Sequence, residues 1–526
     1  MLLTHQSSRG MVVAPHHLAA QAGLAVLREG GNAIEAMIAA AATIAVVYPH
    51  MNGLGGDNFW LIHSPDGPPL ALDACGPAAA QASAAFYRQH GQDAIPARGP
   101  LAALTVAGAV AGWQQAHQLS TRWGGRLPLS RLLEDALHYA RHGAPVTLSQ
   151  QHNTLAKQQE MGAAPGFAEL YLAQSEAGSL FQNPRLADTL QQLIDAGLDD
   201  FYRGDLARSL ATDLEHVGSP LRLADLERYQ AQQVNALALE ISQGTLYNLP
   251  PPTQGLASLM ILGLFDRLAC SEADSFEYVH GLVESTKQAF RVRDRYVTDP
   301  AYLQIEPTDF LKTDRLDSLA ARIDPQRAAP WPHPAGAGDT VWLGAIDGQG
   351  RAVSFIQSLY WEFGSGVVLP SSGITWQNRG TSFSLDPAAS NPLMPGRKPF
   401  HTIQPALAQL KDGRVMPYGT MGGEGQPQTQ AILLTRYARY QQSLRQAVTG
   451  PRWLLGRTWG SMTTNLRIEN RFDPAVIEAL RNAGHDVELI GAFDEVMGHA
   501  GALVWHPNGM IEGAADPRSD GAAAGF

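Results

Sequence analysis

A threonine at the start of a predicted strand is the residue in this sequence best placed to do chemistry. Residues 338–346 and 351–356 are β-rich runs joined by a Gly-containing turn at residues 347–350, which predicts a β-hairpin. Thr340 lies at the start of the first strand. Residues 331–338 before it are rich in Pro, Gly and Ala, so they predict an exposed tether rather than a regular element.

This arrangement suits self-cleavage of the chain. The hydroxyl of Thr340 can attack the carbonyl of Asp339, and hydrolysis of the resulting ester would leave Thr340 as a new N-terminus. A free α-amine has a pKa of about 7.7–8.0, so near neutral pH part of it is unprotonated and can accept the hydroxyl proton. The alternative is an ordinary strand-starting threonine, and the local sequence alone favours that alternative.

Composition bounds the class of protein. The chain has 526 residues, of which 45% are hydrophobic, and this is ample for a large buried core. It contains no low-complexity linker or repeat, so we expect one compact unit. Its formal net charge is −11 and it has no Lys/Arg-rich run, which argues against nucleic acid as a partner.

Cellular location and redox state are predicted from absent signals. The first ten residues lack a charged segment followed by an apolar one, so we expect no signal peptide and a cytoplasmic location. Residues 36–47 are apolar but too short for the roughly 20 residues that span a bilayer. Cys75 and Cys270 are the two cysteines, which argues against a disulfide framework and favours structural thiols.

Periodicity predicts a layered α and β protein with sheets buried between helices. Helices are expected at residues 18–29, 33–47, 107–119, 129–141, 185–196, 200–215, 256–268, 275–296 and 429–440. Further hairpins are expected at residues 59–63 with 70–73, 400–410 with 415–418, and 502–505 with 510–513. The many charges of residues 275–296 are interpreted as a solvated helix face.

Several short stretches, each weak alone, occur together in an order and spacing typical of one family. They are residues 19–32, Leu54-Gly55-Gly56, Pro250-Pro251-Pro252-Thr253, Asp339-Thr340, residues 363–367, Gly422-Gly423 and Ala515-Asp516-Pro517-Arg518. Through them the chain resembles the gamma-glutamyltransferase family of N-terminal-nucleophile hydrolases over essentially its whole length.

The resemblance implies an α+β fold, a four-layer αββα sandwich, made as a precursor. Cleavage between Asp339 and Thr340 would give a large subunit, residues 1–339, and a small subunit, residues 340–526, that stay associated. Thr340 would be the nucleophile, and the backbone N–H groups of Gly422 and Gly423 would form an oxyanion hole, contributing ~3–4 kcal/mol each. We expect no cofactor and no metal, because no cluster with ligand spacing is visible; pairing of the heterodimers stays open.

The sequence departs from the family where transferases hold the γ-glutamyl group. An arginine that binds the α-carboxylate is missing from residues 73–77, which read Asp-Ala-Cys-Gly-Pro, and the acidic pair that binds the α-amine is missing from residues 377–382. A zwitterionic glutamyl group would therefore keep desolvated charges, at several kcal/mol per ion. The acyl donor is predicted to be something else.

A small amide with one carboxylate fits the replacements. Arg379 supplies a cation that can hold a carboxylate through two hydrogen bonds, and bulky Tyr360 narrows the pocket. The other predicted substrate contacts are Asn378, Ser358, His401 and Thr402. Within the family the pattern resembles the branch that hydrolyses oxamate to oxalate and ammonia in purine nitrogen breakdown.

Two other functions stay open. One is a γ-glutamyl hydrolase or transferase that binds the glutamyl group through other residues. The other is an uncleaved, inactive relative with a binding role. For single residues, Arg379 is also compatible with a structural arginine, and His401 with an ordinary core histidine.

Overall fold

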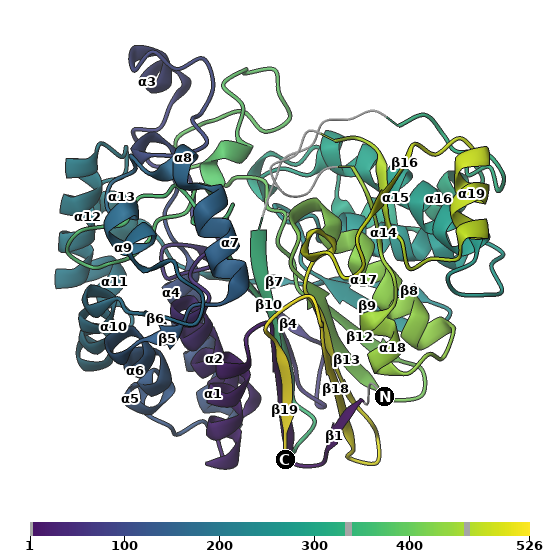
Figure 1. The fold of residues 1–526 in the computed structure, drawn as a ribbon, viewed down its shortest axis with the longest axis horizontal. Coiled ribbons are helices and arrows are strands. Elements are labelled where there is room, and N and C mark those ends of the chain that lie inside the picture. Colours follow the sequence, from purple (N-terminus) through teal and green to yellow (C-terminus); the bar gives the residue numbers. More distant parts are fainter. Residues whose placement is uncertain (1–3, 332–338, 457–462) are drawn as a thin grey trace.

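Two stacked antiparallel sheets form the centre of the computed structural model, which describes residues 4–331, 339–456 and 463–526 (Figure 1). The first has seven strands, in the spatial order β19 (Ala522–Gly525), β2 (Gly10–Ala14), β10 (Asp339–Asp347), β11 (Ala352–Tyr360), β3 (Asp57–His63), β4 (Leu70–Ala74) and β7 (Gln232–Asn235). The second also has seven, in the order β1 (His5–Ser7), β18 (Ile511–Ala515), β17 (Ala500–Trp505), β13 (Val415–Thr420), β12 (Ala406–Leu410), β9 (Gly244–Asn248) and β8 (Leu237–Ile241).

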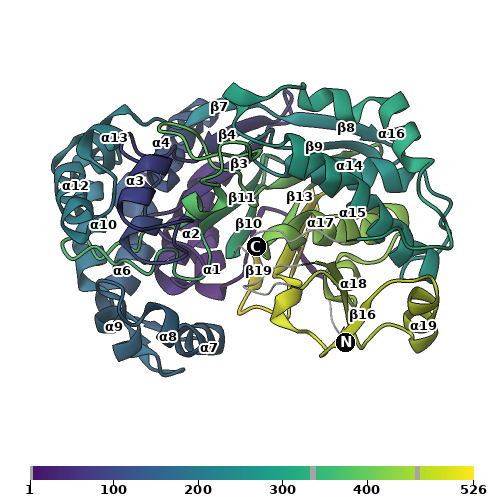
Figure 2. The same cartoon turned by 90° about the horizontal axis from the view of Figure 1, so that it is seen from above.

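Helices cover the outer face of each sheet and complete four layers (Figures 1 and 2). Helices α1 (His17–Arg28), α2 (Ala33–Val47) and α4 (Ala109–Ser120) pack on the first sheet. On the second sheet lie α14 (Gly255–Asp266), α17 (Gln426–Leu434) and α18 (Leu444–Thr449), with α15 (Phe276–Tyr296) packed against α14 and α17. Apolar side chains such as Trp342 and Leu407 fill the space between the sheets.

The remaining elements lie around this sandwich. The other helices are α3 (Ala84–Gln89), α5 (Leu129–Leu132), α6 (Glu134–His142), α7 (Leu148–Ala156), α8 (Gln158–Met161), α9 (Phe167–Leu170), α10 (Pro184–Ala196), α11 (Asp200–Arg203), α12 (Asp205–Val217), α13 (Leu223–Arg228), α16 (Thr313–Ala320) and α19 (Pro474–Asn482). The smaller sheets are β14 (Trp453–Leu455), β15 (Leu466–Glu469) and β16 (Val487–Ile490), and β5 (Ala144–Pro145) with β6 (Leu180–Phe181).

The local sequence explains the best predicted elements. Helix α2 begins and ends at the predicted residues, and Asn32 caps it by accepting from the backbone N–H of Glu35, whose carboxylate accepts from the N–H of Asn32. Every residue of α2 is buried, as its all-round apolar sequence requires. The helix predicted at residues 129–141 is interrupted at Leu133, and the one at residues 200–215 is interrupted at Gly204.

The charges of helix α15 do not form one solvated face, so that part of the prediction was wrong. Glu284, Lys287 and Arg293 are buried, with at most 2% of each residue exposed, whereas Arg291 and Arg295 are exposed. The Nζ atom of Lys287 lies 2.6 Å from Oε1 of Glu284. Helical spacing shows which charges share a face but not what packs against it. Here Ala329 bonds to Glu284 and Lys287, and Glu424 pairs with Arg293.

Two further sequence predictions concern the tether before Thr340 and the length of the apolar helices. Most of the tether expected at residues 331–338 lies outside the described residues. Among the helices that are described, none combines the length and the apolar composition needed to cross a bilayer.

Candidate active site

Thr340 lies at an irregularity in the pairing of β10 with β11. The register of the two strands shifts between Asp339 and Val341, which is a β-bulge, and bulges commonly re-aim side chains beside functional sites. Tyr360, opposite Asp339, has a φ of 85°, a backbone conformation that non-glycine residues rarely adopt. Thr340 itself is fully buried.

Two side chains lie within hydrogen-bonding range of the Thr340 hydroxyl. It donates to Oγ of Ser358 on the neighbouring strand at a long 3.4 Å, and it accepts from Nε2 of Gln426 at 3.3 Å. Ser358 also accepts from the backbone N–H of Tyr360 at 2.8 Å, which fixes its hydroxyl at the end of β11. Ser358, whose role as a substrate contact stays a prediction, therefore lies beside Thr340. Gln426 was not predicted.

Strand ends of both sheets meet around Thr340. Asp57, the first residue of β3, pairs with Ser358, while the loop before β12 carries His401 and Thr402 and the loop after β13 carries Gly422 and Gly423. Figure 2 shows the ends of β10, β11 and β13 close together near the middle of the molecule. Residues far apart along the chain are thus assembled at one end of the sandwich.

The glycine pair after β13 has a backbone conformation that favours glycine. Gly422 and Gly423 have φ angles of 112° and 50°, which side chains disfavour. Gln254 donates to the carbonyl of Gly423 at 2.8 Å, and buried Arg293 holds both Gln254, at 3.0 Å, and Glu424, at 2.9 Å. The loop is therefore rigidly placed, and its use as an oxyanion hole stays a prediction.

Arg379 is fully buried, and its guanidinium group is only partly satisfied. Nη1 donates to Oγ1 of Thr402 at 3.2 Å, and the Tyr360 ring lies 3.8 Å below the guanidinium carbon. Among the described residues, Nε and Nη2 have no hydrogen-bond partner. Burial lowers the pKa of Arg379 to about 10, so the group stays cationic at neutral pH.

Asp57 is a site residue that sequence reasoning missed. Its Oδ1 atom accepts from the backbone N–H groups of Gly76 at 3.1 Å and Gly108 at 2.9 Å. Burial raises the pKa of Asp57 to about 7, although nearby Arg379 and these two N–H groups oppose the shift. An acidic residue directly after a Gly-Gly turn, at the start of an otherwise apolar strand, was the available signal.

The Gly55-Gly56 turn brings Asp57 and Arg379 into one site. A side chain on Gly55 would lie 2.2 Å from the carbonyl oxygen of Thr375, and one on Gly56 would lie 2.1 Å from that of Ser358. The backbone N–H of Gln377 donates to the carbonyl of Gly55 at 3.0 Å. The two glycines are therefore needed for the close approach of the backbone at this turn.

His401 and Asn378 differ in what they offer a ligand. Nε2 of His401 lies 3.3 Å from Oδ2 of Asp57, and burial together with the cations Arg379 and Lys398 holds the pKa of His401 well below its usual value. The ring is therefore neutral. Asn378 uses both polar ends on the backbone, accepting from Trp361 at 3.2 Å and donating to Ala97 at 2.9 Å. Its role in substrate binding stays a prediction.

One grouping of metal-ligand types exists although none was visible in the sequence. His280, Glu284 and His485 are buried together, with ligand atoms within 4.8 Å of one another. Each has protein partners: His280 contacts His485 at 2.9 Å, and Glu284 accepts from Lys287 at 2.6 Å. Lys287 supplies the opposite charge for Glu284, so the grouping is held together by hydrogen bonds within the protein. Cys75 and Cys270 are free thiols, and burial raises the pKa of Cys75 far above its usual value.

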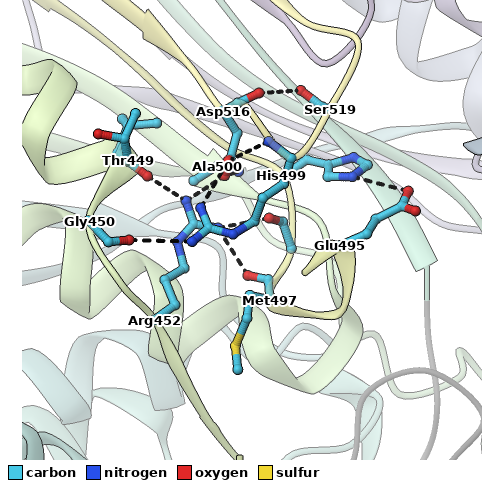
Figure 3. A network of polar contacts seen from close by, with 12 residues as sticks. Thr449, Gly450, Arg452, Glu495, Met497, His499, Ala500, Asp516 and Ser519 are labelled. Carbon is cyan, nitrogen blue, oxygen red and sulfur yellow. Dashed lines mark hydrogen bonds and ion pairs between the residues drawn. The ribbon is translucent and has the colours of Figure 1, made fainter. Parts of the chain in front are cut away.

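The stretch Ala515-Asp516-Pro517-Arg518 lies in a separate buried network (Figure 3). Asp516 accepts from Arg452, from the side chain of Arg518 at 3.0 Å and from the backbone of Ala500 at 2.8 Å. Arg452 also donates to the carbonyls of Met497 and Gly498 at 3.0 and 2.7 Å. This match to the family is therefore part of the framework that carries β17 and β18.

Comparison with known proteins identifies the family and supports the fold. The gamma-glutamyltranspeptidase family matches residues 19–526. The oxamate amidohydrolase proenzyme of Klebsiella pneumoniae subsp. pneumoniae is 56% identical, with 99% of each chain covered. The glutathione hydrolase-like YwrD proenzyme of Bacillus subtilis is 38% identical, again with 99% of each covered. A cephalosporin acylase structure from Bacillus halodurans superimposes with a TM-score of 0.91 at 30% identity, covering 100% of this chain and 97% of that one.

The chain belongs to the gamma-glutamyltranspeptidase family. It is a hydrolase that acts on amide C–N bonds, as predicted, and its αββα fold of the N-terminal-nucleophile hydrolase type is confirmed by its structural relatives. Its two closely similar relatives named above are proenzymes, which agrees with a self-processing precursor.

Proposed function

We propose that this chain cuts itself between Asp339 and Thr340 and then hydrolyses oxamate to oxalate and ammonia, with Thr340 as the N-terminal nucleophile. The products of cleavage are residues 1–339 and 340–526, which remain packed together because each of the two sheets contains strands from both segments. The 56% identical relative, named as an oxamate amidohydrolase proenzyme, supports this choice of substrate.

Self-cleavage begins with attack of the Thr340 hydroxyl on the carbonyl carbon of Asp339. The new C–O bond replaces the C–N bond, and the hydroxyl proton moves to the departing nitrogen, which becomes the α-amine of Thr340. Water then hydrolyses the ester and leaves a carboxyl group on Asp339. The β-bulge at this point and the positive φ of Tyr360 support the proposal, because distorted backbone is often retained where a bond must react.

Turnover uses the same hydroxyl with a different base. The α-amine of Thr340 accepts the hydroxyl proton while Oγ attacks the amide carbonyl of the substrate, and the N–H groups of Gly422 and Gly423 bind the oxyanion. The α-ammonium returns the proton to the leaving nitrogen, ammonia departs, and water hydrolyses the oxalyl ester. The fixed positions of both glycines support this role, since preorganised donors need no rearrangement during reaction.

The substrate class is inferred from one edge of the Arg379 guanidinium group, whose nitrogens lack hydrogen-bond partners among the described residues. Nε and Nη2 lie on one edge of the guanidinium group, the edge that binds a carboxylate through two parallel N–H···O bonds. Both are buried, and in the described part of the chain neither has a partner. Since an unsatisfied buried donor is costly, an anionic ligand group is the natural partner. A short substrate whose carboxylate is held there would present its amide to Thr340.

The test combines intact mass with ammonia release from a panel of small acid amides and a γ-glutamyl anilide. We expect the wild type to appear as two fragments divided at Asp339-Thr340 and to release ammonia from oxamate. Thr340→Ala is expected to remain one chain of about 56.5 kDa and to release none.

The other outcomes identify the alternatives. A split enzyme that ignores oxamate but turns over the glutamyl donor would show that glutamyl recognition uses other residues, and the oxamate assignment would fall. A wild-type chain that folds but never splits would contradict the nucleophile assignment and favour a binding protein.

A further inference from the structure

We propose that Gln426 is a catalytic residue: its side-chain amide donates a hydrogen bond to the Thr340 oxygen and stabilises the charge that develops there during self-cleavage and turnover. This inference rests on the proposed function of Thr340. The carrying observation is the 3.3 Å contact from Nε2 of Gln426 to Oγ1 of Thr340, between two side chains that are both fully buried.

The amide of Gln426 has one possible orientation. Its Oε1 atom accepts from the backbone N–H of Gln404 at 3.2 Å, and a backbone N–H can only donate. The nitrogen of the amide must therefore face Thr340, and it has only hydrogen atoms to offer. The Thr340 oxygen accepts one of them, so the amide of Gln426 acts as a donor toward the atom that would attack a carbonyl carbon.

A chain of buried amides holds this arrangement in place. Gln404 accepts from Asn248 and donates through Nε2 to Gln430 at 2.9 Å, while Gln430 donates back to the Gln404 carbonyl at 3.1 Å. Ser258 completes the chain by donating to Gln430 at 2.6 Å. All of these side chains are at most 1% exposed, and none of them titrates, so the orientation of Gln426 does not change with pH.

The position of Gln426 in the fold ties it to the predicted oxyanion hole. It is the first residue of α17, directly after the short turn that contains Gly422 and Gly423. This one turn therefore positions two sets of hydrogen-bond donors: the N–H groups of Gly422 and Gly423 for the substrate oxyanion, and the amide of Gln426 for the nucleophile. The first group would stabilise charge on the substrate oxygen, and Gln426 would stabilise charge on Oγ as its proton leaves.

Two substitutions distinguish the effect of the hydrogen-bond donor of Gln426 from the effect of its side-chain volume. Gln426→Glu keeps the shape and the acceptor for Gln404 but presents a carboxylate to Thr340, whereas Gln426→Met keeps most of the volume and removes both polar atoms. A lost hydrogen bond to a charged group costs 1.5–3 kcal/mol, so we expect self-cleavage and kcat to fall about 10- to 150-fold at pH 8, with little change in KM.

The pH profile of Gln426→Glu is the diagnostic measurement. As the pH falls below the pKa of the new carboxyl group, the protonated form regains an O–H donor, so self-cleavage should recover toward the wild-type rate. Gln426→Met should show no such recovery. Rates are followed by pulse-labelled cell-free synthesis on denaturing gels, and kcat is normalised to the cleaved fraction.

Gln428 supplies a matched control on the same helix. It is also fully buried, and its amide accepts from the backbone N–H of Leu455 at 2.8 Å and donates to the carbonyl of Leu455 at 3.1 Å, away from Thr340. Gln428→Glu is expected to split and turn over within about threefold of wild type after correction for folded protein.

Other results would contradict either the role of Gln426 or the proposed function on which it rests. Wild-type rates in both Gln426 variants would overturn it, and so would equal losses in the Gln426 and Gln428 variants without recovery at low pH, which would indicate a packing defect. If the wild type itself neither splits nor hydrolyses oxamate, the proposed function has failed. If it splits but does not hydrolyse oxamate, only the substrate is wrong, and the self-cleavage rates still test Gln426.

Discussion

Arg379 and Arg452 are equally buried arginines in two different charged groups of this protein. Each has at most 1% of its surface exposed, and burial lowers the pKa of each to about 10. Arg452 donates to three backbone carbonyls and to Asp516 (Figure 3). Arg379 donates to Thr402, and the described residues offer Nε and Nη2 nothing further.

The aspartates near these two arginines, Asp516 beside Arg452 and Asp57 near Arg379, differ in the same way. Burial raises the pKa of Asp516, but the guanidinium groups of Arg452 and Arg518 outweigh that effect and hold the pKa below its usual value. For Asp57 burial prevails, and the pKa rises to about 7. Burial of charge alone therefore does not mark a functional site. A buried charged group whose hydrogen bonds are incomplete does mark such a site, because a ligand can supply the missing partner.

The largest expected effect is a loss of unfolding free energy when Arg452, the fully paired arginine, is replaced. Arg452→Met leaves Asp516 with one cation fewer and removes donors from three carbonyls, so the free energy of unfolding should fall by about 3–5 kcal/mol. Urea titration of the uncleaved Thr340→Ala chain, with and without the second substitution, measures this difference. Activity per folded molecule should be unchanged. A loss of activity without a loss of stability would erase the distinction between the groups.

Arg379→Lys should show the opposite pattern. A lysine ammonium cannot provide the two parallel donors of a guanidinium edge, so kcat/KM for oxamate should fall by roughly 30- to 1000-fold, which corresponds to about 2–4 kcal/mol. Stability of the uncleaved chain should change by less than about 1 kcal/mol, because Nε and Nη2 have no hydrogen-bond partner to lose among the described residues. An intact kcat/KM would show that Arg379 is a framework residue like Arg452.

Much of the fold could be predicted because its signals are local. The hairpin of β10 and β11, helix α2 and the two glycines after β13 follow from alternation, capping and turn residues within short windows of sequence. The bulge at Thr340 could not be predicted, since it depends on the register with β11.

The site was only partly predictable because its remaining contacts are non-local. Arg379 and Thr340 were identified through family resemblance, but Asp57 reaches them only through the pairing of β3 with β11. Arg293 was read as part of a solvated face, although it holds Glu424 beside the glycine pair. Gln426 carries no charge, so nothing in its type or spacing distinguished it from the other glutamines of α17.

The opposite pKa shifts of the two aspartates predict a smaller effect that depends on pH. The pKa of Asp57 is about 7 in the folded chain and near 3.8 in the unfolded one, so its contribution to stability is fully present below pH 3.8 and is lost as the pH rises through 7. Asp57→Asn can keep accepting from Gly76 and Gly108 and removes the titration. Its unfolding free energy should therefore decline less than that of wild type between pH 4.5 and 7.5, by at least about 1 kcal/mol.

Equal slopes for the wild type and Asp57→Asn would show that Asp57 is ionised throughout this range. Asp516→Asn serves as the counterpart. Its lowered pKa means that its contribution is lost as the pH falls, so that substitution should destabilise the chain most at neutral pH.

The smallest effect is expected at an arginine whose ion-pair partner is exposed to water. Arg131 binds Glu29 through two short hydrogen bonds of 2.6 and 2.7 Å, yet 44% of the Glu29 side chain is exposed. Such pairs contribute 0–1 kcal/mol, because water competes for both ions. Arg131→Met should therefore leave oxamate hydrolysis unchanged and lower the unfolding free energy by less than about 1 kcal/mol in urea titration. A cost similar to that of Arg452→Met would mean that geometry of pairing, rather than burial, sets the stability of these arginines.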